Sequence, residues 1–401
     1  MSPRKRSSLS SRSPSEVGRE IGLYLHLPFC VRKCCYCDFD SAPLEAAGGL
    51  AAARRYVEAL CIELDRRAAS TEFHGGRVAT IYLGGGTPTV LPTEWLAEVL
   101  GRVRHRFPLA PEAEITVEAN PGTVDEGKVA ALLAAGANRL SLGAQSFSDQ
   151  VLRTLGRAHD ANQSLAAIRA ARAAGCRNLG LDLIYGVPGQ SLEEWQGSLR
   201  QALEARPEHI SAYGLSVEPG TALARVMAAG ELAEVGEDLY ARMYAMAAKT
   251  LVAAGYRHYE ISNFALPGYE CCHNRRYWAG AEYLGLGCSA HSYNGGVRWN
   301  NLAGAGVYTE WLDRGLLPVQ RAEALSPPRR LAELLMLGLR LAEGVSEKGL
   351  AARTGLRFGE VFGQEIASLC EQRMLVKSGD RLRIPRARWI VSNEVLSYLA
   401  G

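Results

Sequence analysis

Two patterns of apolar and polar positions follow one another repeatedly over residues 21–216. Short apolar runs that end in turn residues predict buried strands. Longer stretches rich in Ala, Leu and Arg lie between them and predict amphipathic helices. The predicted strands are residues 21–27, 79–83, 114–118, 139–142, 179–184 and 209–215. The predicted helices are residues 56–67, 93–106, 126–135, 164–174 and 192–204.

This repetition of strand and helix predicts an α/β fold with parallel strands and helices packed outside them. Six such units favour a partial (β/α)6 barrel, and a doubly wound open sheet is the alternative. In both architectures the chemistry belongs at the carboxyl ends of the strands.

The rest of the chain divides into two further segments. Residues 236–322 begin with a predicted helix at 237–254 and continue as loop-rich sequence. Residues 323–401 predict helices at 328–342 and 359–372 and a short turn, LVKSGDRLRIP, which together indicate a small winged-helix-like domain. Such a domain can bind DNA, but no dense basic recognition helix is present, so we expect a cap on a barrel at residues 19–235.

Composition is typical of a globular protein, with 47% hydrophobic and 22% charged residues among 401. A net charge of +3 is too small to indicate nucleic acid or a membrane as partner. No apolar run is long enough to span a bilayer. Residues 1–18 are basic and Ser-rich without an apolar segment, so we expect a disordered tail and not a secretory signal. Free thiols favour the cytoplasm.

Three cysteines follow the first predicted strand in the run YLHLPFCVRKCCYCDFD. Cys30, Cys34 and Cys37 have the spacing Cys-x3-Cys-x2-Cys, which can hold three corners of a [4Fe–4S] cluster. The fourth iron would then be open to a substrate or cosubstrate. A disulfide framework is unexpected at ten cysteines in 401 residues. Zinc would need a fourth ligand, for which His26 and Asp38 are poorly placed.

Cys35 allows a second triple, made of Cys30, Cys35 and Cys37. In that triple only one residue would separate the ligands Cys35 and Cys37, which would strain the loop around a cubic [4Fe–4S] cluster. The sequence therefore favours Cys34 as the ligand.

Other polar and glycine-rich positions fall at the same predicted strand ends. The run GGGTPT, residues 84–89, follows the second strand, and its free amides could clamp a ligand of the open iron. Glu118, Gln145, Arg157 and Asp182 lie at or just beyond strand ends. A carboxylate there can accept hydrogen bonds from the two hydroxyls of a ribose, and an arginine can form an ion pair with the carboxylate of a ligand.

Two histidines lie in the third quarter of the chain. His273 belongs to YECCHNRRYW, a cluster of Cys, His and aromatic residues that suits a haem face and an axial ligand, or else a packed core. His291 stands alone in GLGCSAHSY, where packing or a satisfied hydrogen bond is expected.

The assembled motifs resemble those of radical S-adenosylmethionine (SAM) proteins of the coproporphyrinogen oxidase type. Within that group the chain is most similar to the HemW-type haem chaperones. The resemblance covers nearly the whole chain from residue 21. The motifs that carry it are LHLPFCVRKCCYCDF, YLGGGTPT, SLGAQSF, GRAH, DLIYGVPGQ, EPGT, YEISNFA and CHNRRYW.

The resemblance implies a cofactor set and its residues. Cys30, Cys34 and Cys37 would ligate the cluster, and SAM would chelate the open iron. Reduction of the cluster would cleave SAM to a 5′-deoxyadenosyl radical. The haem-associated motif would be His273, Asn274 and Tyr277. The implied SAM contacts are Tyr24, Tyr36, Gly85, Gly86, Thr87, Glu118, Gln145, Arg157, Asp182 and Ser216.

Two departures separate the chain from the oxidases that it resembles. Oxidases have a fourth cysteine where Phe39 stands, and a longer segment before the first strand. A third departure is Cys35, since relatives usually have proline there. The expected function is therefore a haem chaperone that passes haem to an acceptor protein, for example a respiratory one. An oxygen-independent coproporphyrinogen III oxidase is the alternative, and a winged-helix regulator is a third hypothesis. We expect an electron donor for the cluster, and a monomer or homodimer.

The two adjacent cysteines give a local test. Cys34→Ala should abolish the cluster, because two thiolates cannot hold it. Cys35→Pro should leave the iron content of anaerobically reconstituted protein unchanged. If only the Cys35 variant lost iron, Cys35 and not Cys34 would be the cluster ligand.

Overall fold

The computed structural model describes residues 19–70, 73 and 75–400. The predicted basic tail, residues 1–18, lies outside the described residues.

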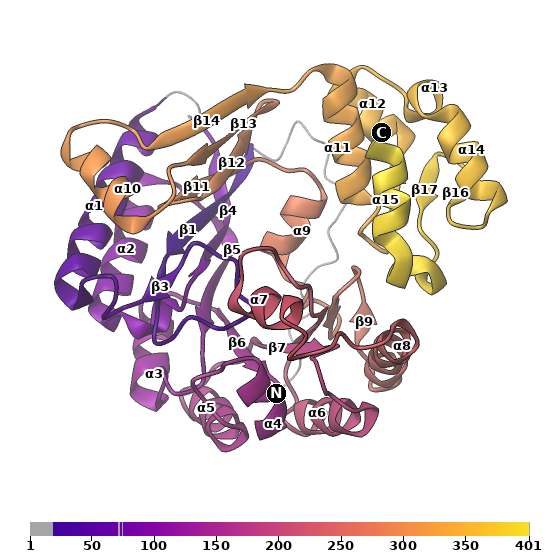
Figure 1. Ribbon diagram of the computed structural model, residues 1–401. Helices are drawn as coiled ribbons and strands as arrows, with labels where there is room; N and C mark the ends of the chain where they lie inside the picture. Colours follow the sequence, from indigo (N-terminus) through magenta and orange to yellow (C-terminus); the bar gives the residue numbers. More distant parts are fainter. Residues whose placement is uncertain (1–18, 71–72, 74, 401) are drawn as a thin grey trace, which may run out of the picture.

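The predicted strands form the parallel centre of one sheet, which has twelve strands within the described residues (Figure 1). The central order is β1-β4-β5-β6-β7-β8, and every neighbouring pair is parallel. Because spatial order follows chain order, the sheet has no switch point of the doubly wound kind. The fold is therefore a partial α/β barrel. These strands are β1 (Glu20–Leu27), β4 (Arg77–Gly85), β5 (Leu109–Ala119), β6 (Arg139–Gln145), β7 (Leu179–Tyr185) and β8 (His209–Gly214).

The helices that connect these strands cover the outside of the curved sheet (Figure 1). Two of them, α2 and α6, have the predicted bounds. Helix α6 begins at a capping box, in which the Ser191 hydroxyl accepts from the Glu194 amide and the Glu194 carboxylate accepts from the Ser191 amide. These helices are α1 (Gly49–Ala69), α2 (Thr93–Arg106), α3 (Glu126–Ala134), α4 (Asp149–Thr154), α5 (Ala161–Ala173) and α6 (Leu192–Glu204).

The expectation of loop-rich sequence within residues 236–322 is wrong. After α8 (Glu237–Ala253), short strands extend both edges of the sheet. Strand β11 pairs in parallel with β1, and β10 pairs antiparallel with β8. These strands are too short and too polar to show the alternation of apolar and polar residues that predicts a strand. The added elements are α7 (Ala222–Ala228), β9 (Arg257–His258), β10 (Asn263–Ala265), α9 (Cys272–Trp278), β11 (Tyr283–Leu286), β12 (His291–Asn294), β13 (Val297–Asn301), α10 (Ala305–Asp313) and β14 (Val319–Ala324).

A buried carboxylate fastens this extension to α1. Glu63 is 0% exposed and accepts hydrogen bonds from the Gly287 amide at 2.9 Å, the Tyr308 hydroxyl at 2.7 Å and the Asn301 side-chain amide at 2.8 Å. Burial raises its pKa above the usual value for a glutamate. Without the carboxylate the Gly287 amide and the Tyr308 hydroxyl would lose their acceptor, whereas the Asn301 amide would keep the Gly287 carbonyl at 2.9 Å.

The C-terminal segment has its own core, which includes Leu335, Phe358 and Trp389. It packs on the barrel through Arg353, which donates to the Ala279 carbonyl at 2.7 Å. The predicted helix at 359–372 is two helices that meet at Phe362. The elements are α11 (Pro327–Gly338), β15 (Val345–Ser346), α12 (Glu347–Thr354), α13 (Phe358–Val361), α14 (Gly363–Glu371), β16 (Val376–Ser378), β17 (Arg381–Arg383) and α15 (Ser392–Ala400).

Across the described ranges, none of the helices combines the length and the apolar character needed to cross a lipid bilayer.

Glu63→Ala should lower the free energy of unfolding by about 3 kcal/mol, because buried donors lose their acceptor. The measurement is urea denaturation of the full chain. Glu58→Ala is the control on the same helix, since Glu58 forms a surface pair with Arg54 at 2.9 Å and should change stability by less than about 0.5 kcal/mol. Equal effects of the two variants would contradict the role assigned to Glu63.

Candidate functional site

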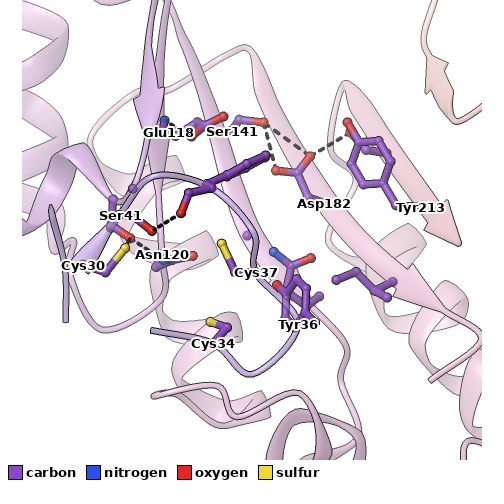
Figure 2. A pocket seen from close by; sticks show the side chains of 18 of the residues that line it. Cys30, Cys34, Tyr36, Cys37, Ser41, Glu118, Asn120, Ser141, Asp182 and Tyr213 are labelled. Atoms are coloured by element: carbon purple, nitrogen blue, oxygen red, sulfur yellow. Dashed lines mark hydrogen bonds between the residues drawn. The ribbon is translucent and has the colours of Figure 1, made fainter. Parts of the chain in front are cut away.

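A cavity of about 450 Å³ opens at the carboxyl ends of the parallel strands, and we call it the mouth cavity (Figure 2). It forms there because loops from successive parallel strands converge on one rim. Most of the sequence-predicted cluster and SAM residues lie in its wall. These are Cys30, Cys34, Tyr36, Cys37, Gly85, Gly86, Thr87, Glu118, Gln145, Arg157, Asp182 and Ser216.

The cysteine loop presents three thiols to this cavity (Figure 2). Arg157 donates to the sulfur of Cys34 at 3.3 Å, and the Thr87 hydroxyl lies 3.8 Å from the sulfur of Cys30. Donors that point at sulfur favour the thiolate, the form that binds metal. Burial raises the pKa of Cys30, so a bound cation would be needed to hold its charge. This set of soft donors on one loop fits an iron–sulfur cluster.

Cys35 is directed away from the mouth cavity. Its thiol donates to the Thr154 carbonyl at 3.1 Å, and its amide donates to the Leu155 carbonyl at 3.3 Å. Proline has no N–H and would lose the hydrogen bond to the Leu155 carbonyl. Cys35→Ala keeps that bond and is therefore the better comparison for Cys34→Ala in the iron measurement.

The glycine-rich turn after β4 does not offer the free amides expected from its sequence. The amide of Gly85 donates to Glu118 at 3.3 Å, that of Gly86 to the Leu27 carbonyl at 2.9 Å, and that of Thr87 to the Phe29 carbonyl at 2.7 Å. A Cβ at Gly86 would lie 2.6 Å from the Phe29 carbonyl oxygen. Glycine is therefore required for close approach to the chain after β1, and not for backbone donation to a ligand.

Two half-buried carboxylates face the mouth cavity. Glu118 accepts from the Tyr82 hydroxyl at 2.8 Å, and burial raises its pKa to about 7. Asp182 accepts from the Ser211 hydroxyl at 2.7 Å and from Ser141, and burial raises its pKa also. Both side chains can accept from ligand hydroxyl or amino groups.

Arg157 and Gln145 complete the rim. Arg157 also donates to the Gly143 carbonyl at 2.9 Å and to Asn120, while its buried Nε has no hydrogen-bond partner among the described residues. Gln145 has a φ of 62°, in the left-handed region, where the register between β6 and β7 shifts. Strained backbone of this kind is common at functional sites.

Tyr24 is the one implied SAM residue that does not line the mouth cavity. Its ring packs on Tyr82, with centroids 6.3 Å apart, and its hydroxyl lies 3.1 Å from Nδ1 of His26. Tyr82 is itself in the wall of the mouth cavity, so Tyr24 is one side chain removed from it.

The predicted haem motif on α9 is divided among three environments. His273 is 1% exposed, with Nδ1 at 2.8 Å from the Thr80 hydroxyl and Nε2 at 2.8 Å from the Tyr277 hydroxyl. Burial lowers its pKa to about 3, so the ring is neutral and both nitrogens are engaged. Asn274 lines the mouth cavity, whereas Tyr277 lines a second cavity.

A distant glutamate determines where α9 begins. Glu114 of β5 accepts from the amides of Cys272 and His273, both at 3.0 Å. The first amides of a helix have no partner within it, and a carboxylate satisfies them well. The sequence gives no local sign of this cap.

The second cavity, which we call the interdomain cavity, has a volume of about 800 Å³ and lies between β11–β13 and α11. His291 lines it. Its ring is exposed and has no hydrogen-bond partner among the described residues, so the expectation of a packed or satisfied histidine is wrong. The strand β12 is only four residues long, and His291 is its first residue.

Sequence reasoning missed several residues of the mouth cavity. Their signal is the alternation of inward positions along each strand, since Ser211 is the register partner of Asp182 and Ser141 is the partner of Gly180, two residues earlier on the same face of β7. Arg139 is 2% exposed with Nε and Nη1 unpartnered among the described residues, and nothing local indicates it. The missed residues are Tyr82, Asn120, Arg139, Ser141, Ser211 and Tyr213.

Comparison with known proteins agrees with this geometry. Residues 24–202 match the Radical SAM superfamily, and residues 325–390 match the HemN C-terminal domain. The solved coproporphyrinogen III oxidase HemN of Escherichia coli has the same fold, with a TM-score of 0.82 over 96% of this chain and 90% of that one, at 23% identity. The barrel and its cysteine loop thus define a protein of the radical SAM class.

Curated relatives give the narrower family. The chain is 39% identical to the heme chaperone HemW of Mycobacterium tuberculosis over 96% of each chain. It is 43% identical to the heme chaperone HemW of Escherichia coli over 68% of this chain and 69% of that protein. The heme chaperone HemW of Bacillus subtilis is 33% identical over 94% of this chain and 98% of its own. The chain belongs to the HemW family.

The raised pKa of Glu118 predicts a pH-dependent stability. Between an ordinary value of 4.5 and a folded value of about 7, the folded protein keeps a proton that the unfolded chain releases. Stability from this group therefore falls as the pH rises through that window. The difference in the free energy of unfolding between Glu118→Gln and the unsubstituted protein should shift in favour of the variant from pH 5 to pH 8. The measurement is urea unfolding without SAM. An identical difference at both pH values would contradict the shift.

Proposed function

We propose that the protein is a cytoplasmic haem chaperone that carries one [4Fe–4S] cluster and binds SAM. It would bind haem and transfer it to an acceptor protein, with a separate electron donor for the cluster and no role for nucleic acid. Membership of the HemW family, whose curated relatives are named heme chaperones, supports this assignment.

The observation that carries the proposal is the cysteine loop. Cys30, Cys34 and Cys37 face one cavity at the barrel mouth, and the place of a fourth cysteine is taken by Phe39, which is 60% exposed. A phenylalanine side chain has no ligand atom for iron. Three thiolates would leave one iron free for SAM, as in the resemblance drawn from the sequence.

The walls of the mouth cavity suit a zwitterionic nucleoside. Glu118 and Asp182 would accept from its hydroxyl and amino groups, Arg157 would donate to its carboxylate, and Tyr36 would pack near the base. Gly85, Gly86 and Thr87 would line the site beside the cysteine loop, and Gln145 and Ser216 would complete the polar rim. When bound, the cluster and SAM together supply one-electron reductive chemistry.

The motif on α9 would serve haem binding indirectly. Tyr277 is in the wall of the interdomain cavity, and His273 is hydrogen-bonded to it at 2.8 Å. We assign His273 the role of holding Tyr277 in place, and Asn274 that of linking the motif to the mouth cavity. The assembly would act as a monomer or homodimer.

Haemin titration of anaerobically reconstituted full-length protein tests the proposal. A saturable Soret change at about one haem per chain is expected, with about four irons bound before haem is added. Incubation with coproporphyrinogen III, SAM and a reductant is the control and should yield no protoporphyrinogen. Absence of saturable haem binding, or formation of protoporphyrinogen, would contradict the assignment.

A further inference from the structure

The interdomain cavity is larger than the mouth cavity and has a different wall. Its volume of about 800 Å³ is within the range of roughly 300–1,000 Å³ that is usual for ligand sites. Aromatic rings and aliphatic side chains make up most of its wall, among them Trp278, Tyr283 and Leu337. Such a wall suits a large flat ligand with an apolar body.

His291 faces this cavity from the sheet. In β12 it lies two residues from Tyr293, so both side chains are on the same face, and Tyr293 pairs with Arg298 of β13. Burial, with a smaller contribution from Arg298, lowers the pKa of His291 below its usual 6.5. The ring is exposed to the cavity and has no hydrogen-bond partner among the described residues, so a ring nitrogen is available to a metal.

Helix α11 supplies the opposite wall. Arg330, Leu334 and Leu337 are spaced i, i+4 and i+7, and therefore lie on one face of the helix. Within the part of the chain that the structure describes, Arg330 has no carboxylate in salt-bridge range and its buried Nε has no hydrogen-bond partner. An unpaired guanidinium in a mostly apolar wall indicates an anionic group on the ligand.

The other charged groups of the cavity have partners. Arg298 is paired with Glu333 at 2.6 Å and with Glu323 at 2.9 Å. Asp40 accepts from the Ser289 hydroxyl at 2.7 Å and from the Gly304 amide at 2.8 Å. The guanidinium of Arg340 lies over the ring of Trp278, 5.2 Å from its centroid, and is near the carboxylate of Glu260.

We propose that the interdomain cavity is the haem site, with His291 as an iron ligand and Arg330 as the partner of a propionate. This inference rests on the proposed haem chaperone function and changes the residue that binds iron. His273 is enclosed, and both of its ring nitrogens are hydrogen-bonded, whereas His291 is exposed to the cavity. Phe39 lines both cavities, so the site adjoins the cluster loop.

The test compares haemin with protoporphyrin IX, which has the same propionates and no iron. In cluster-reconstituted full-length protein, His291→Ala should weaken haemin binding about tenfold and change the ferric visible spectrum, with no effect on protoporphyrin fluorescence. Added imidazole should restore the spectrum. Arg330→Ala should weaken both ligands about tenfold, because both have propionates.

Matched controls are His105→Ala on the exposed side of α2 and Arg200→Ala on α6, which should leave both titrations unchanged. Iron content before titration reports that each variant is folded. An unaltered haemin spectrum and affinity in His291→Ala would overturn this inference while the proposed function stands. A failure of the unsubstituted protein to bind haemin would overturn both.

Discussion

The buried carboxylate of Glu114 connects the barrel to the segment on which both cavities depend. It lies in β5 and accepts from the first amides of α9, more than 150 positions later in the chain. Charge-assisted hydrogen bonds of this kind contribute about 1.5–3 kcal/mol each. With α9 held in this way, Asn274 of the helix lines the mouth cavity, and Tyr277 and Trp278 line the interdomain cavity.

The two cavities are neighbours in space but have different chemistry. The mouth cavity is smaller and is lined by thiols, carboxylates and a guanidinium, which suits a cluster and a polar cosubstrate. The interdomain cavity is larger and mostly apolar, and it contains the exposed imidazole of His291 and the guanidinium of Arg330, whose buried Nε has no hydrogen-bond partner among the described residues. Phe39 follows the cysteine loop and lines both, so a ligand in the larger cavity would contact the chain that carries the cysteines. The C-terminal domain takes part in this second cavity, because residues of α11 form one of its walls.

The sequence predicted the parallel core well because each of its strands and helices is long enough to show its own period. It predicted α2 and α6 to the residue, and Ser191 with Glu194 gives a local signal for one of these starts. It did not predict β9–β14, because those strands are short and are stabilised by pairing with distant partners. The same limit applies to Arg139, which is buried among groups from several strands.

Local spacing was sufficient to select the cysteine loop, its three candidate ligands and the polar residues at the strand ends. Their meeting in one cavity followed from the rule that parallel strands end at one rim. Only the tertiary structure decided the environments of the histidines, since the exposure and hydrogen bonding of a ring depend on chain segments that pack on it from elsewhere. The sequence left His273 as either an axial ligand or a packed core residue, and the structure shows it enclosed by Thr80 and Tyr277. His291 was expected to be a packing residue and faces an open cavity.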